Sequence, residues 1–140
     1  MCECIASVPL QLNKMNIKDY KLSAIVDTIV RSHNDNRGCT IDILNGQSPT
    51  SGYIVSCHGY EKRINHKQIT PFEVAEYLKI TIYTLLSYQF YIGTWYNPED
   101  GYTYFDLCKV ITNKDDAIKY GKHQKQLTIY DIESQAIITL

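Results

Sequence analysis

Apolar side chains recur at intervals of three and four residues near the start of the chain, which is the spacing of one helix face. This stripe predicts an α-helix over residues 19–34, and Asn36 and Gly38 follow it as stop signals. Arg31 and His33 fall in its last turn, where a cation suits the negative end of the helix dipole. The apolar positions are Leu22, Ile25, Val26, Ile29 and Val30.

Two further helices are predicted from the residues that begin them. Thr70 can cap a helix, Pro71 fits the first helical position, and Glu73 completes a capping box. Apolar residues at helical spacing continue from there to about Leu86. Residues 112–116 open the other helix, because polar capping side chains precede two acids where the helix dipole favours them.

The pattern changes to β-prone and aromatic in residues 88–97, and a second run of the same kind covers residues 102–107. The residues between these runs are Pro98-Glu99-Asp100-Gly101. Proline presets one backbone dihedral, glycine accepts a positive φ, and aspartate can bond its own backbone. We therefore predict a β-hairpin that forms the centre of a sheet and one wall of any binding site.

Shorter β-prone runs predict the remaining strands. Residues 61–65 follow a bend and are expected to return beside the strand at 53–58. The element order predicts an α+β fold, a mostly antiparallel β-sheet with two to three helices packed against it. Residues 1–15 are predicted to be a flexible lead-in, and residues 16–140 a single domain. The strands are expected at 39–44, 53–58, 61–65, 127–132 and 136–140.

Composition limits the kinds of partner. The net charge is −1 and the pI is near 6.4, which argues against a DNA- or RNA-binding surface. Two or three basic side chains would still suffice for one small anionic ligand. No apolar run approaches the ~20 residues of a membrane span, and no secretory signal is expected. Five cysteines without framework spacing predict reduced thiols in a cytoplasmic protein.

The sequence shows no complete set of catalytic residues. Cys57 and His58 are neighbours on a predicted strand, so they point to opposite faces and cannot form a dyad. Cys2 and Cys4 resemble two of the four ligands of a zinc site, but no second Cys or His pair with the usual spacing completes it. Asp100 fits the chemistry of the hairpin turn, and Asp115 and Asp116 fit that of a helix start. Asp106 has no such local explanation. We predict a protein that is not an enzyme and needs no cofactor or metal.

The aromatic residues of the hairpin exceed what one face of a sheet can bury. Some of these rings should therefore face solvent, a groove or another subunit. An exposed ring beside a cation suits a nucleobase and its phosphate. The alternative is that the rings belong to the core and to an oligomer interface. The set is Tyr88, Phe90, Tyr91, Trp95, Tyr96, Tyr102, Tyr104 and Phe105.

Part of the chain, about residues 38–131, resembles a group of small phage-encoded proteins, the anti-Thoeris sponge proteins of the first type. The resemblance rests on four segments: Gly52-Tyr53-x-Val55-Ser56-x-x-Gly59-x-Glu61; Tyr91-Ile92-Gly93-x-Trp95; Gly101-x-x-Tyr104-x-Asp106; and Ala117-Ile118-x-x-Gly121-x-x-x-x-Gln126-x-x-Ile129-Tyr130-Asp131.

This resemblance implies a binding protein rather than an enzyme. Such proteins sequester a cyclic ADP-ribose signal that a bacterial TIR-domain defence enzyme makes, and they leave the signal intact. They assemble as homo-oligomers, dimer-based and up to hexamers, with nucleotide pockets between subunits. Some members also bind cyclic oligonucleotides. A counter-defence role would place this chain in the host cell cytoplasm.

The resemblance also suggests residues for the ligand's parts. A purine would stack on Trp95 or Phe90, and ribose hydroxyls would meet Asn97 or Asp106. Arg31 and Lys114 would hold the phosphates. Lys114 would act as a point charge, because a lysine cannot bind a phosphate through two parallel N–H groups as an arginine does. The alternative function is a protein–protein inhibitor of a host defence or restriction complex, with the aromatic surface as its hot spot.

Overall fold

The computed structural model describes residues 19–140, so the predicted lead-in at 1–15 lies outside the described part. Three helices pack on one antiparallel sheet, which confirms the predicted α+β class. Within residues 19–140, no helix combines the length and apolar character needed to cross a membrane. The elements are α2 (Asp19–Asn36), β1 (Gly38–Asp42), β2 (Tyr53–Ser56), β3 (Lys62–Ile64), α3 (Pro71–Tyr88), β4 (Tyr91–Asn97), β5 (Tyr102–Ile111), α4 (Lys114–His123), β6 (Thr128–Asp131) and β7 (Ala136–Thr139).

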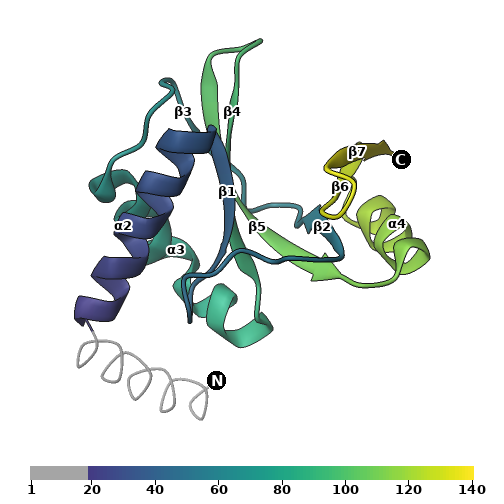
Figure 1. Cartoon of the computed structure of the whole chain (residues 1–140), viewed down its shortest axis with the longest axis horizontal. Helices are drawn as coiled ribbons and strands as arrows, with labels where there is room; N and C mark the ends of the chain where they lie inside the picture. Colours follow the sequence, from purple (N-terminus) through teal and green to yellow (C-terminus); the bar gives the residue numbers. More distant parts are fainter. Residues whose placement is uncertain (1–18) are drawn as a thin grey trace.

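The predicted hairpin is the centre of the sheet. Strands β4 and β5 pair over the whole of β4, and the strand order is β1-β4-β5-β2-β6-β7. β5 is long enough to pair with β3 near its start and with β2 near its end (Figure 1). The expectation that residues 61–65 return beside the strand at 53–58 is wrong, because β3 pairs with β5 instead.

The predicted helix starts of α3 and α4 are confirmed. The Thr70 hydroxyl accepts the Glu73 backbone N–H at 3.3 Å, and the Glu73 carboxylate accepts the Thr70 N–H at 3.0 Å. Asn113 caps α4 by accepting the Asp116 backbone N–H at 3.0 Å. α3 ends where Gln89 adopts a left-handed conformation with φ 55°. Local sequence therefore sets these helix ends, as the capping pattern indicated.

The first helix differs from its prediction at the C-terminal end. α2 continues to Asn36, and His33 is fully buried rather than placed at the helix end as a cation. The His33 Nε2 donates to the Lys67 carbonyl at 2.9 Å, so Nδ1 accepts from the Thr94 hydroxyl at 2.7 Å. Burial lowers the pKa of His33, which favours the neutral ring. His33 therefore joins α2 to β4 and to the β3–α3 loop.

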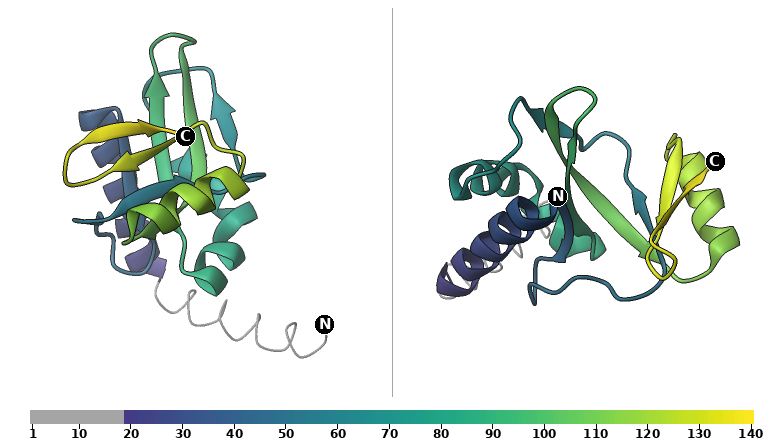
Figure 2. Two further views of the ribbon diagram at one scale, coloured as in Figure 1. Left: turned by 90° about the vertical axis from the view of Figure 1, so that its right-hand side faces the viewer. Right: turned by 45° about the horizontal axis from the view of Figure 1, so that its top comes forward.

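The apolar residues form two clusters along one side of the sheet. The larger one joins α2 and α3 to β1, β4 and β5, with Tyr77 edge-on to Phe105 at 5.3 Å between ring centroids. The smaller one lies under α4 and is built from Val55, Ala117 and Ile129. Figure 2 shows that α2 and α3 lie at one end of the sheet, and α4 lies at the other with β6 and β7. The hairpin spans the distance between them.

Candidate functional site

The other side of the sheet has no helix over it within the described residues (Figures 1 and 2). We call it the open face. Paired residues of adjacent antiparallel strands point to the same side, so the register defines its members. They are Gly38, Thr40 and Asp42 of β1; Tyr91, Gly93, Trp95 and Asn97 of β4; Tyr102, Tyr104, Asp106, Cys108 and Val110 of β5; Arg63 of β3; Ile54 and Ser56 of β2; Thr128 and Tyr130 of β6; and Ile137 and Thr139 of β7.

One row across the open face carries the features of a binding platform. We call it the aromatic row, and its members in spatial order are Gly38, Trp95, Tyr104 and Arg63. The Trp95 and Tyr104 rings stack with centroids 5.3 Å apart and an interplanar angle of 20°. Trp95 is nevertheless 49% exposed. Its partner position on β1 is Gly38, which has no side chain to cover the ring.

The cation of the aromatic row is held by its neighbours. The Arg63 guanidinium lies 4.4 Å from the centroid of the Tyr102 ring, a cation–π contact. The Tyr104 hydroxyl donates to the Asp100 carboxylate, and this bond lowers the pKa of Asp100. Arg63 pairs with Tyr104 in the strand register and remains exposed. An exposed guanidinium thus stands in a defined place beside the stacked rings.

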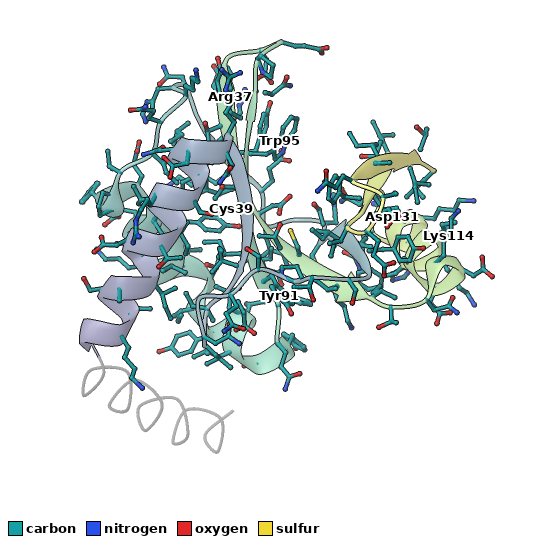
Figure 3. All side chains as sticks on the ribbon, in the orientation of Figure 1. Arg37, Cys39, Tyr91, Trp95, Lys114 and Asp131 are labelled. Atoms are coloured by element: carbon teal, nitrogen blue, oxygen red, sulfur yellow. The ribbon has the colours of Figure 1, made fainter. Side chains whose placement is uncertain are left out.

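A second arginine lies at the opposite border of the aromatic row. Arg37 immediately precedes Gly38, is exposed, and has a positive φ of 65°. Its carbonyl accepts the backbone N–H of Tyr96 at 2.9 Å, which ties it to the strand that carries Trp95. Figure 3 shows Arg37 and Trp95 at the same end of the sheet. Trp95 and Tyr104 therefore lie between two chain segments that each carry an arginine.

The next row of the open face contains a buried acid. Asp106 pairs with Gly93, and Thr40 pairs with Gly93 from the other side. The Cys108 thiol donates to Asp106 Oδ1 at 3.0 Å, and the nearby Ser56 hydroxyl acts to lower the pKa of the same carboxyl group. Burial raises the pKa of Asp106, since both groups are neutral and compensate only part of the desolvation.

Three of the six predicted ligand residues lie together on the open face. Trp95 and Asp106 occupy adjacent rows, and Asn97 lies at the hairpin end beside Tyr102. The Asn97 side-chain oxygen accepts the Glu99 backbone N–H at 3.0 Å, so Asn97 also shapes the hairpin turn. The hairpin is the centre of the sheet as predicted, and its role as one wall of a site stays a prediction.

The other three predicted ligand residues lie elsewhere in the chain's fold. Phe90 precedes β4, packs against the larger apolar cluster and stacks on Tyr88 with centroids 5.7 Å apart. Arg31 is on the exposed side of α2, two positions from the buried Ile29. Lys114 is at the start of α4, far along the sheet from Trp95 (Figure 3). One copy of the chain does not bring these residues to the aromatic row.

Sequence reasoning missed Arg63, Arg37 and Gly38 as site residues. Arg63 becomes adjacent to Tyr104 only through the β3–β5 pairing, which the local pattern did not indicate. Gly38 was taken as a helix stop signal, yet its position opposite Trp95 leaves that ring uncovered. A period-two count through residues 91–97 and 102–108 would have separated Trp95 and Tyr104 from Ile92 and Phe105.

The thiols near the site are poor nucleophiles. Cys108 is buried, and burial raises its pKa well above the ordinary value. Cys57 is also buried with a raised pKa, and it contacts the Tyr120 hydroxyl at 3.5 Å. Both therefore stay protonated near neutral pH, and the thiolate is the reactive form.

Comparison of the chain with models of protein families, with curated proteins and with solved structures gave no match.

Proposed function

We propose that this protein binds a signalling nucleotide of the cyclic ADP-ribose type on its open face and holds it without breaking a bond. The observation that supports this most directly is the half-exposed Trp95, stacked on Tyr104 on one side and facing Gly38 on the other. A ring held upright with one free π-face is a stacking partner for a nucleobase, worth about 1–3 kcal/mol per base. By sequestering the signal, the protein would act as a phage counter-defence factor in the host cytoplasm.

The flanking arginines suit the anionic part of such a ligand. A guanidinium presents several N–H donors in a plane and can bind phosphate oxygens in pairs. Arg63 is exposed and lies over the Tyr102 ring, while Arg37 borders the Gly38 side. Local cations would let a chain with net charge −1 attract a pyrophosphate.

A homo-oligomer is part of the proposal. Lys114 is exposed at the start of α4, far along the sheet from the aromatic row, and Arg31 is exposed on α2, which packs on the other side of the sheet. In a symmetric assembly, a second copy could bring one of these cations to the open face of the first. The proposal also includes cyclic oligonucleotides, because a stacking ring and arginines do not by themselves select one nucleotide.

The absence of cleavage is supported by the chemistry near the row. His33 is buried under the opposite side of β4, and the thiols of Cys57 and Cys108 are buried and protonated. The hydrogen bond of the Asp106 side chain is to the Cys108 thiol, and among residues 19–140 no base is bonded to that thiol. A nucleophile with an adjacent general base is the arrangement that covalent catalysis needs.

Calorimetry with cyclic ADP-ribose tests the proposal. Trp95→Ala should weaken binding by roughly 5- to 150-fold, the equivalent of one lost stacking interaction. Tyr88→Ala removes another exposed ring, 67% exposed at the end of α3, and should leave affinity unchanged. Heating the complex should release the ligand intact. Recovery of a cleaved product, or equal binding by the Trp95 variant, would contradict the proposal.

A second candidate function is supported by the rest of the open face. Ile54, Val110, Tyr130 and Ile137 continue it as an apolar surface, with Ile137 68% exposed. Contiguous exposed apolar residues mark many protein interfaces, which fits an inhibitor of a host defence or restriction complex. Co-purification of one host protein, abolished by Ile137→Lys and accompanied by no nucleotide affinity, would favour this function.

A further inference from the structure

Helix α3 exposes large apolar side chains on the side that faces away from the sheet. Phe72 is 71% exposed, Ile80 72% and Tyr83 38%. The outer side of a surface helix is ordinarily polar, and exposed apolar residues that lie together mark an interaction surface. The buried side of the same helix is formed by Val74, Tyr77, Leu78, Thr81, Ile82 and Leu85. α3 is therefore apolar on both sides, although the sheet covers only one of them.

Four residues of α3 lie in one line along this exposed side: Phe72, Glu76, Lys79 and Tyr83. They follow one another at intervals of four, three and four residues, the spacing at which residues of one helix meet a second helix. The Lys79 Nζ donates to Glu76 Oε1 at 2.8 Å. An ion pair therefore lies at the centre of the line, with an aromatic ring at each end. We call these four residues the α3 seam.

We propose that the α3 seam binds the same seam of a second copy of this chain, with the two helices antiparallel about a two-fold axis. Phe72 and Tyr83 lie equally far from the midpoint between Glu76 and Lys79. In an antiparallel pair centred on that midpoint, Phe72 of each copy packs on Tyr83 of the other. Glu76 of each copy then meets Lys79 of the other. Every member of the seam thus has a suitable partner.

The charges of the seam select this partner and this direction. In the antiparallel pair each Glu76 lies between two lysines, one from each copy, so four charges alternate in sign around the axis. A parallel pair would instead set Glu76 against Glu76 and Lys79 against Lys79, and these contacts are repulsive. The two-fold axis also brings Ile80 of both copies to the same side of the seam, where the two side chains shield the ion pairs from water.

This interface is separate from the open face. α3 packs against the opposite side of the sheet, as part of the larger apolar cluster. A dimer through the α3 seam therefore leaves the open faces of both copies uncovered. The inference does not depend on nucleotide binding, and its test uses the protein without a nucleotide.

Sedimentation equilibrium of the full chain over a concentration series tests the proposal by measuring the dissociation constant of the dimer. The wild type should dimerise. Glu76→Lys should weaken the dimer by about 10- to 100-fold, because two contacts between like charges replace the two interchain ion pairs. Lys79→Glu should weaken it by a similar factor for the same reason.

Mixing the two variants gives the decisive result. Glu76→Lys carries lysine at both central positions of the seam, and Lys79→Glu carries glutamate at both. Neither variant has the ion pair within its own helix, but a mixed dimer has opposite charges at every contact between the chains. An equal mixture should therefore dimerise about as tightly as the wild type, which a purely intrachain role of the ion pair would not produce.

Lys119→Glu is the matched control. It makes the same charge change on an exposed position of α4 and should keep the wild-type dissociation constant. Circular dichroism checks that each variant is folded. If a charge variant does not fold, Phe72→Ala replaces it, since a ring 71% exposed in the single chain contributes little to its stability. This variant should also weaken the dimer.

Three results would overturn the proposal: a wild type that stays monomeric at millimolar concentration, seam variants that dimerise like the wild type, or a mixture that associates as weakly as its components. Equal weakening by Lys119→Glu and Lys79→Glu would also overturn it, because net charge rather than the seam would then control association. Calorimetry with cyclic ADP-ribose is a separate measurement, so a failed dimer and a failed nucleotide site can be told apart.

Discussion

The two faces of the β4–β5 hairpin share a backbone but differ in almost every other respect. Phe105 is 1% exposed under α3, while its neighbour Tyr104 stacks on the half-exposed Trp95. Thr94 is buried and hydrogen-bonded to His33. On the other face, the neighbouring Gly93 leaves room for the buried carboxyl group of Asp106. Alternate residues along one strand therefore serve stability on the covered face and, under the proposed function, ligand contact on the open face. This separation predicts that substitutions at adjacent positions will have different consequences.

The largest expected effect is on the covered face. Phe105→Ala removes a fully buried ring and its edge contact with Tyr77, which should cost about 3–5 kcal/mol of unfolding free energy. Urea denaturation followed by circular dichroism measures this loss. A loss below about 1 kcal/mol would show that the side chain is not buried as described.

A smaller effect concerns pH and the buried His33. Burial lowers the pKa of His33 from its ordinary 6.5, so the unfolded chain binds this proton more readily than the folded one. Stability should therefore be complete above the ordinary pKa and decrease as the pH falls below it. Urea denaturation of the wild type at several pH values measures the slope.

His33→Gln provides the comparison for that slope. Glutamine can still donate to the Lys67 carbonyl and accept from Thr94, but it does not titrate. The variant should lose the pH dependence in the window just below the ordinary histidine pKa. The same slope in both proteins would mean that other groups produce it, and that the His33 ring is not held neutral by its burial.

The smallest effect on stability is expected on the open face. Trp95→Ala removes a half-exposed ring and one cross-strand contact, which should cost about 0.2–1 kcal/mol. The same variant should lose most of its nucleotide affinity. Trp95→Ala should therefore affect binding more than stability, whereas Phe105→Ala should affect stability most. A stability loss as large as that of Phe105→Ala would place Trp95 in the core and remove the contrast between the faces.

Much of the fold could be predicted because its signals are local. The capping residues Thr70 and Glu73 bond within one helical turn, and the Pro98–Gly101 turn joins adjacent strands. Helix and hairpin ends depend on such short-range chemistry, so they can be read from neighbouring residues. His33 shows the limit of this reasoning, because its partners Thr94 and Lys67 lie far along the chain.

The candidate site was predictable only in part for the same reason. The aromatic excess of the hairpin indicated that some rings would be exposed, and Trp95 is. Asp106 was singled out because no turn or helix start explained it, and it lies one row from Trp95. Arg31 and Lys114 were assigned to phosphate from a resemblance, and the fold of one chain leaves them on α2 and α4, away from the aromatic row.

By itself, the sequence determined the number and kind of the elements, because periodicity and capping act over a few residues. Only the tertiary structure decided which residues share a face. The pairing of β3 with β5 brings Arg63 to Tyr104, and the register of β1 sets Gly38 against Trp95. Such pairings join segments that are distant in the chain, and their energies depend on the packing of the whole sheet rather than on any local pattern.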